Sequence, residues 1–253
     1  MKLLLEISFL GTAYCGYQVQ PKLATVQGEL NNATKDLFGF DCDIVGCSRT
    51  DSGVHANQFF ATVTQKGTNT INTDIPIDKI AMALSVRLPM DIAVNRATFV
   101  DDAFHPRYDV KRKEYMYCVW NAGIRNPFLS NRAWHYSRQI SDEDIEKMRT
   151  AAELLVGTHD FSSFMASNSG VIDTVRTIYH VRIERDGDTI RFFVCGNGFL
   201  YNMVRIIVGT LICVAEGKIH PSEISTIIES HDRTLAGMTA PAHGLYLNRV
   251  EYR

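Results

Sequence analysis

The sequence lacks an apolar run long enough to cross a bilayer. Its longest such run, residues 206–215, is flanked by Arg205 and Glu216 and is far shorter than the roughly 20 residues that a membrane-spanning helix needs. The N-terminal stretch MKLLLEISFL is interrupted by Glu6, and no small-residue cleavage site follows it. We therefore expect a cytoplasmic protein without a membrane partner, with a core helix at 206–215 and a strand at the N-terminus.

The cysteines are too scattered to indicate a disulfide framework or a metal centre. None belongs to a Cys-x-x-Cys pair or lies beside a histidine at the spacing of metal ligands. The six positions are Cys15, Cys42, Cys47, Cys118, Cys195 and Cys213. We expect reduced, mostly buried thiols and no metal.

A large excess of charge of one sign is absent too. The formal net charge of -2 argues against a polyanionic partner, although net charge does not describe how charges are distributed. Hydrophobic residues make up 45% of the chain and charged residues 21%, which excludes a disordered protein. The 253 residues contain no internal repeat or long linker, and they suffice for one large domain or two modest ones.

The first part of the chain alternates between strand and helix patterns. Apolar residues at 3, 5, 7 and 9 form one face of a strand, and a helical pattern lies between Thr25 and Gly39. Further elements expected here are strands near 43–46, 58–64 and 91–99 and a helix near 78–87.

The second part begins with a strand in which Tyr115, Tyr117 and Val119 share one face. Ser141 and Asp144 predict a capped helix that ends at Gly157. The remaining elements expected are a hairpin of 174–183 with 189–195 across Asp186-Gly187, helices at 201–216 and after Pro221, and a strand at 244–252. This order of elements predicts an α+β fold with mainly antiparallel sheets.

One short motif carries candidate chemistry. In GCSRTDSGVHA, residues 46–56, Asp51 lies on an expected loop between strands, two residues after Arg49 and four before His55. On its own, Asp51 can simply cap a turn while the other two residues are incidental. A metal site at Asp51 and His55 is a second alternative, but it lacks a supporting cluster of ligands.

Seven segments in order carry a resemblance that gives this motif a function. They are FLGTAYCGYQVQPKLATVQGEL, SRTDSGVHA, LPMDIAV, FHPRYDVKRKEYMY, HDFSSF, FLYNMVRIIVG and GLYL. Together they resemble the TruA-type tRNA pseudouridine synthases over nearly the whole chain. The resemblance implies two similar α/β-sandwich halves with a basic active-site cleft between them, and a homodimer. It also implies isomerisation of uridine to pseudouridine without a cofactor, at tRNA positions 38, 39 and 40 of the anticodon stem-loop.

The resemblance assigns catalytic roles residue by residue. Asp51 matches the catalytic aspartate, which either attacks a carbon of the ribose or base or abstracts a ribose proton. Arg205 matches the arginine that pairs with it and keeps it ionised. Arg49 matches the arginine that opens the RNA and occupies the space of the target base. Tyr115 matches the tyrosine that lies against the uracil ring, and Leu245 an apolar residue of the base pocket.

Without the resemblance, three of these residues have ordinary structural explanations. Arg205 fits a helix-terminal arginine that extends to solvent. Tyr115 fits a core aromatic residue on a strand, and Leu245 needs no explanation beyond its strand.

Basic residues cluster between 107 and 138, ahead of the acidic residues Asp142, Glu143, Asp144 and Glu146. The cluster contains Arg107, Lys111, Arg112, Lys113, Arg125, Arg132 and Arg138. It predicts an RNA-binding surface with strong salt dependence, to which Arg107, Arg112 and Lys113 belong as substrate-binding residues. For any single side chain, a solvated charged face is an equal alternative.

The sequence departs from the family pattern at Phe9-Leu10-Gly11, at Tyr17 and at Cys47-Ser48. These departures leave open which RNA site is modified, so another tRNA uridine is the first alternative. A non-catalytic RNA-binding protein and a metal-dependent hydrolase are the others. We expect two domains, 1–104 with the Asp51 loop and 105–253 with the other site residues.

Overall fold

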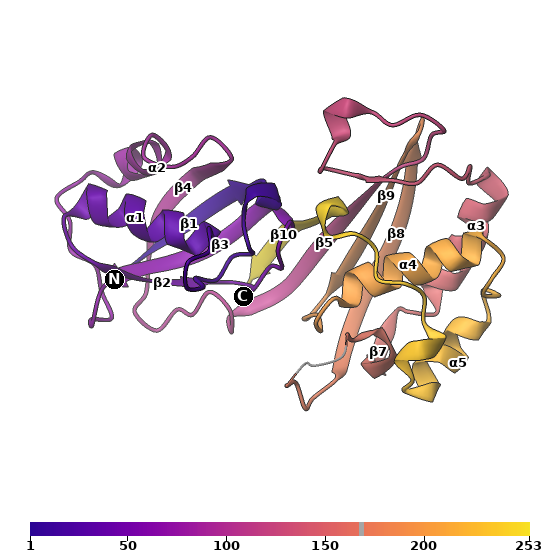
Figure 1. Cartoon of the computed structure of the whole chain (residues 1–253). Coiled ribbons are helices and arrows are strands. Elements are labelled where there is room, and N and C mark those ends of the chain that lie inside the picture. The colour runs from indigo at the N-terminus through magenta and orange to yellow at the C-terminus, as the bar shows by residue number, and fades with distance from the viewer. Residues whose placement is uncertain (167–169) are drawn as a thin grey trace. The chain divides into compact units, whose positions relative to one another are not determined.

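The computed structural model describes residues 1–166 and 170–253 (Figure 1). Packing divides the chain into two compact units, Met1–Lys111 with Tyr246–Arg253, and Arg112–Leu245. The sequence placed the division after residue 104 and kept the last strand in the second domain. Here that strand belongs with unit 1, because Tyr246 and Leu247 pair in parallel with His55 and Ala56.

Unit 1 contains a mixed sheet that two helices cover on one face (Figure 1). Its strands are β1 (Lys2–Phe9), β2 (Cys42–Gly46), β3 (His55–Gln65), β4 (Ile92–Val100) and β10 (Leu245–Tyr252). β1 pairs antiparallel with β3 and β4, β2 pairs antiparallel with β3, and β10 pairs in parallel with β3. The alternating residues 3, 5, 7 and 9 of β1 are buried, as their period predicts.

The helices of unit 1 are α1 (Val26–Phe38) and α2 (Ile77–Ser85). The hydroxyl of Thr25 accepts a hydrogen bond from the N–H of Gly28 in the first turn of α1, and Gly39 ends the helix. Both predicted boundaries of α1 are therefore confirmed. α2 packs on β4 and buries Ile80 and Leu84.

Unit 2 is built on an antiparallel sheet in the order β5-β9-β8-β7, with β6 parallel to β5. The strands are β5 (Val110–Trp120), β6 (Trp134–His135), β7 (Gly157–Asp160), β8 (Val175–Asp186) and β9 (Thr189–Gly196). The helices are α3 (Asp142–Glu153), α4 (Met203–Ala215) and α5 (Glu223–Ser230). Short 3-10 helices lie at Gly11–Ala13, Pro127–Leu129, Ser162–Phe164, Arg233–Leu235 and Ala242–Gly244.

Local signals explain most of unit 2. Ser141 and Asp144 form the predicted capping box of α3, each side chain bonding the other residue's backbone N–H. Asp186 pairs with Thr189, so the β8–β9 hairpin turns at the predicted place. The predicted end of α3 was wrong, since the helix ends at Glu153, ahead of Gly157 at the start of β7.

The α+β class with mainly antiparallel pairing is confirmed. The sequence analysis missed the short strands β6 and β7, whose four or fewer residues are too few for a period to be visible. All six cysteines are free thiols, and Cys47, Cys118 and Cys195 are buried. Within residues 1–166 and 170–253, no helix combines the length and apolarity that crossing a membrane requires.

Candidate active site

Asp51 lies on a loop that joins β2 to β3, as the sequence predicted. The backbone N–H of Val54 donates to the carbonyl of Asp51 at 3.1 Å, which closes a turn. Gly53 sits in this turn with φ of 79°, a conformation that favours glycine. The turn leaves the Asp51 side chain partly exposed.

The backbone of the N-terminal segment holds this loop in place. Tyr14 supplies its carbonyl to the hydroxyl of Ser52 at 3.2 Å and to the N–H of Gly53 at 3.4 Å. The N–H of Tyr17 donates to the carbonyl of Thr50 at 3.1 Å. The segment is itself anchored, because the Tyr14 hydroxyl donates to Asp91 at 2.6 Å. Burial and this bond raise the pKa of Tyr14, so its hydroxyl stays protonated.

His55 fixes the loop from its other end. Its Nδ1 accepts a hydrogen bond from the N–H of Gly11 at 2.9 Å, and its ring lies 4.6 Å from that of Tyr246. The side chain is fully buried, so His55 is a structural residue. Among the residues that the structure describes, no group of three His, Cys, Asp or Glu side chains could hold a metal ion.

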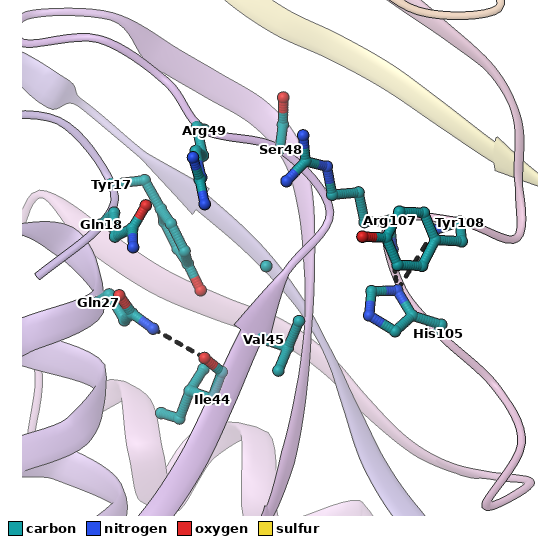
Figure 2. A pocket seen from close by; sticks show the side chains of 11 residues that line it. Tyr17, Gln18, Gln27, Ile44, Val45, Ser48, Arg49, His105, Arg107 and Tyr108 are labelled. Atoms are coloured by element: carbon teal, nitrogen blue, oxygen red, sulfur yellow. Dashed lines mark hydrogen bonds between the residues drawn. The ribbon is translucent and has the colours of Figure 1, made fainter. Parts of the chain in front are cut away.

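Arg49 and Arg107 line one pocket of unit 1, which Figure 2 shows. Its volume is 260 Å³. The other lining residues are Tyr17, Gln18, Gln27, Ile44, Val45, Gly46, Ser48, His105 and Tyr108. Unit 1 therefore brings Arg107 of the basic cluster next to Arg49 of the Asp51 motif, which lies 58 residues earlier in the sequence.

In unit 2, Arg205 lies in the first turn of α4 with its guanidinium oriented by two bonds. Nε donates to the carbonyl of Ala240 at 2.6 Å, and Nη1 donates to the Asn202 side chain at 2.7 Å. The side chain is partly buried, so the alternative of an arginine that simply extends to solvent does not describe it.

The chain after residue 236 lies directly against α4 and supplies the Ala240 carbonyl. A Cβ at Gly209, one turn after Arg205, would come within 1.8 Å of the Met238 carbonyl oxygen. The N–H of Gly237 donates to the hydroxyl of Thr210 at 2.9 Å. This close backbone approach places Ala240 where it can hold Arg205.

Leu245 belongs to the same stretch of chain. The Tyr117 hydroxyl donates to the carbonyl of Pro241 at 2.7 Å, and the Tyr117 ring leaves no room for a side chain at Gly244. Burial and, second, the charge of Arg205 lower the pKa of His243. The segment 240–245 thus contains Leu245 and also supplies the Ala240 carbonyl that binds Arg205. The sequence analysis named neither Tyr117 nor His243 as part of this arrangement.

Tyr115 is buried on β5, and its ring packs edge-on against Phe199 at 5.1 Å. Phe199 lies in the loop between β9 and α4. The ring contact therefore connects β5 to the loop that precedes α4, the helix that carries Arg205. A packed ring of this kind has a fixed orientation.

The basic cluster is divided between the units. Arg107 and Lys111 belong to unit 1, and Arg112, Lys113 and the later members belong to unit 2. Arg112 is exposed and Lys113 partly exposed on β5, beside a Glu114 that pairs with His180 at 2.9 Å. Arg138 lies 3.9 Å from Glu216, so part of the cluster's charge is compensated locally.

The predicted site residues fall into two sets. Unit 1 contains Asp51, Arg49 and Arg107, and unit 2 contains Tyr115, Arg205, Leu245, Arg112 and Lys113. The expected pairing of Asp51 with Arg205 joins residues of different units and stays a prediction.

Comparison with known proteins identifies the family. A chain named tRNA pseudouridine synthase A from Thermoanaerobacter sp. (strain X514) is 45% identical over 249 residues, which cover 98% of each chain. Proteins of the same name from Bacillus pumilus and Bacillus subtilis are 45% and 43% identical, each over 100% of this chain and 99% of the relative. A family model described as tRNA pseudouridine synthase matches residues 151–253.

This chain therefore belongs to the tRNA pseudouridine synthase family. It is an isomerase that makes pseudouridine. Among solved structures, a chain of a Cbf5–Nop10–Gar1 complex is 13% identical, with a TM-score of 0.38. That alignment covers 97% of this chain but only 48% of the other, and a similarity this low does not bear on the site.

Proposed function

We propose that this protein isomerises uridine to pseudouridine in tRNA, just 3′ of the anticodon in the anticodon stem-loop. The observation that carries the proposal is the Asp51 loop, which the carbonyl of Tyr14 and the imidazole of His55 hold in one shape. A reactive carboxylate needs such support, because small displacements of a catalytic group cost large factors in rate.

In the proposed reaction, Asp51 acts on the ribose or base of the target uridine. The bond between N1 and C1′ breaks, the uracil rotates, and C5 forms the new bond to C1′. The proton lost from C5 is balanced by the one that N1 gains. Atoms and charge are conserved, and neither a cofactor nor a metal takes part in any of these steps.

The other residues prepare the base and the carboxylate. Arg49 occupies the space that the flipped uridine leaves in the RNA, a step that costs a few kcal/mol without such compensation. Tyr115 lies against the uracil ring and assists loss of the C5 proton, and Leu245 lines the base pocket. Arg205 keeps Asp51 ionised, and its hydrogen bonds to Ala240 and Asn202 orient its guanidinium.

Arg107, Arg112 and Lys113 bind tRNA phosphates in this proposal, and the protein acts as a cytoplasmic homodimer. The family membership supports these assignments. The departures at Phe9-Leu10-Gly11 and Tyr17 fall on the segment that holds the Asp51 loop.

The test is to incubate the purified protein with unmodified tRNA transcripts and to map pseudouridine by chemical labelling, because the isomerisation does not change mass. We expect labelling just 3′ of the anticodon, with and without a chelator. Labelling at another uridine would contradict the proposed site, and loss of activity with a chelator would favour metal-dependent chemistry.

A further inference from the structure

We propose that the pocket of Figure 2, here called the Arg107 pocket, binds one backbone phosphate of the RNA substrate away from the uridine that is isomerised. This inference rests on the proposed function for its ligand, since it takes the substrate to be RNA. It deepens the proposed phosphate contact of Arg107 by assigning it to one pocket and to one phosphate.

The pocket is cationic on its open side. Arg49 and Arg107 are both exposed, and Figure 2 shows the Arg107 guanidinium extending toward Ser48 and the Arg49 side chain beside Tyr17. Neither guanidinium is engaged in a hydrogen bond or ion pair within the described part of the chain. No aspartate or glutamate lines the pocket. The planar guanidinium of Arg107 matches the geometry of a phosphate, and no carboxylate opposes the anion. Arg49 adds only positive charge here, because its side chain is the one proposed to occupy the space of the flipped uridine.

His105 adds a donor whose direction is fixed. Its Nδ1 accepts from the backbone N–H groups of Arg107 at 3.1 Å and Tyr108 at 3.3 Å. The ring proton is therefore on Nε2, which is left to donate. The N–H of His105 itself donates to Asp109 at 2.8 Å, and its ring packs on Tyr108 at 4.2 Å. These contacts form the turn that carries Arg107.

The inner wall of the pocket is rigid. Gln27 donates to the carbonyl of Ile44 at 2.7 Å and accepts from the N–H of Val19 at 2.9 Å. Tyr17 is only 2% exposed, and its hydroxyl has no hydrogen-bond partner among the described residues. A buried polar group without a partner is costly and uncommon in folded proteins, and this one belongs to a residue that lines the pocket.

Size and position favour a single group of a longer RNA. The volume of 260 Å³ lies just below the roughly 300 to 1,000 Å³ of ordinary small-molecule pockets. Arg49 is two residues before Asp51, so a phosphate held here sets the distance between the RNA backbone and the carboxylate. The Arg107 pocket would thus fix the position of the RNA strand relative to Asp51.

The test uses phosphate-ethylation interference on end-labelled tRNA, which shows every phosphate whose neutralisation weakens binding. We compare the full-length wild type with Arg107→Gln and Arg107→Lys. Arg96→Gln is the matched control, because Arg96 is an exposed arginine of β4 in the same unit and does not line the pocket.

We expect Arg107→Gln to raise the tRNA Kd about tenfold and to erase interference at one or two phosphates while the other positions persist. Arg107→Lys should restore part of the tRNA affinity and part of the lost interference. Arg96→Gln should keep the wild-type interference pattern. An Arg107→Gln variant that weakens every position equally would overturn the proposal, because Arg107 would then be a non-specific surface charge.

A second arm separates the two sources of phosphate. Inorganic phosphate is titrated while the His105 imidazole is followed by NMR. A His105 response to inorganic phosphate, together with an interference pattern that Arg107→Gln leaves unchanged, would overturn the proposal in favour of a free-phosphate site. If the wild type gives the expected pattern on tRNA but makes no pseudouridine there, the proposed function fails and the RNA-binding pocket stands.

Discussion

The imidazole of His55 accepts a hydrogen bond from the backbone N–H of Gly11 at 2.9 Å, across 44 residues of sequence. A Cβ at Gly11 would lie 1.9 Å from the carbonyl oxygen of Val54. The backbone at Gly11, in the N-terminal segment, is therefore in direct contact with the backbone at Val54, at the end of the Asp51 loop. The shape of the loop depends on a glycine that is distant in sequence.

We expect Gly11→Ala to destabilise the protein by on the order of 1 to 3 kcal/mol, the usual cost of overpacking, because the new methyl group must displace Val54. The displaced loop should also lower the rate of pseudouridine formation. Urea denaturation and single-turnover assays measure the two effects. Gly123→Ala is the control, since a Cβ there has no neighbour within 4 Å. Equal stability of the two variants would contradict this account of the loop.

Asp51→Asn should lower the rate of pseudouridine formation by at least about 10³-fold, the order of loss seen when a catalytic residue is removed from other enzymes. The fold and most of the tRNA affinity should persist, because the amide has nearly the shape of the carboxylate. A filter-binding assay and chemical mapping of pseudouridine measure affinity and rate. Substantial isomerisation by this variant would exclude Asp51 as the catalytic group.

Arg205→Met should move the acid limb of the rate–pH profile to higher pH, because the proposed partner that keeps Asp51 ionised is lost. A carboxylate without a nearby cation protonates more readily, so activity disappears at a higher pH as the solution is acidified. Arg205→Lys should recover part of the rate, since it restores charge but not the planar fork. Single-turnover rates at saturating tRNA across pH provide the measurement.

His243 gives an internal control for the Arg205 variants. Burial first, and then the charge of Arg205, lower the pKa of His243 from 6.5. Arg205→Met should therefore raise that pKa, but leave it below its ordinary value because the burial remains. NMR titration of the imidazole would detect this change. A Met variant with the raised His243 pKa and an unshifted acid limb would show that Arg205 does not assist Asp51.

Alanine at Arg112 and Lys113 together should weaken tRNA binding without changing which uridine is modified. Each lost phosphate contact reduces the slope of log affinity against log salt by about 1. Binding measured over a salt series, together with pseudouridine mapping, tests both statements. A changed modification site with an unchanged salt slope would assign these residues to recognition of the base sequence.

Gly209→Ala separates two opposing effects on α4. Alanine is favoured over glycine within a helix by about 1 kcal/mol, which alone predicts stabilisation. The added Cβ would lie 1.8 Å from the Met238 carbonyl oxygen, and backbone cannot yield as a flexible side chain does. We expect net destabilisation in urea and a lower rate, because the segment that holds Arg205 must move. A stabilised, fully active variant would show that the segment is free to shift.

Local structure followed from the sequence wherever a short signal determines it. The cap at Thr25, the capping box at Ser141 and the alternating pattern of β1 each involve residues a few positions apart. The position of Asp51 on a loop between strands could be predicted for the same reason. The ordered motifs also gave the family, which the full-length relatives confirm.

Tertiary structure alone decided what holds the site residues. The support of the Asp51 loop comes from backbone groups of residues 11–17, and that of Arg205 from the carbonyl of Ala240. β10 joined unit 1 through parallel pairing with β3. Periodicity and capping act between neighbours in sequence, whereas backbone groups are the same in every residue. A long-range contact between them leaves no pattern in the sequence, apart from a glycine where two backbones meet.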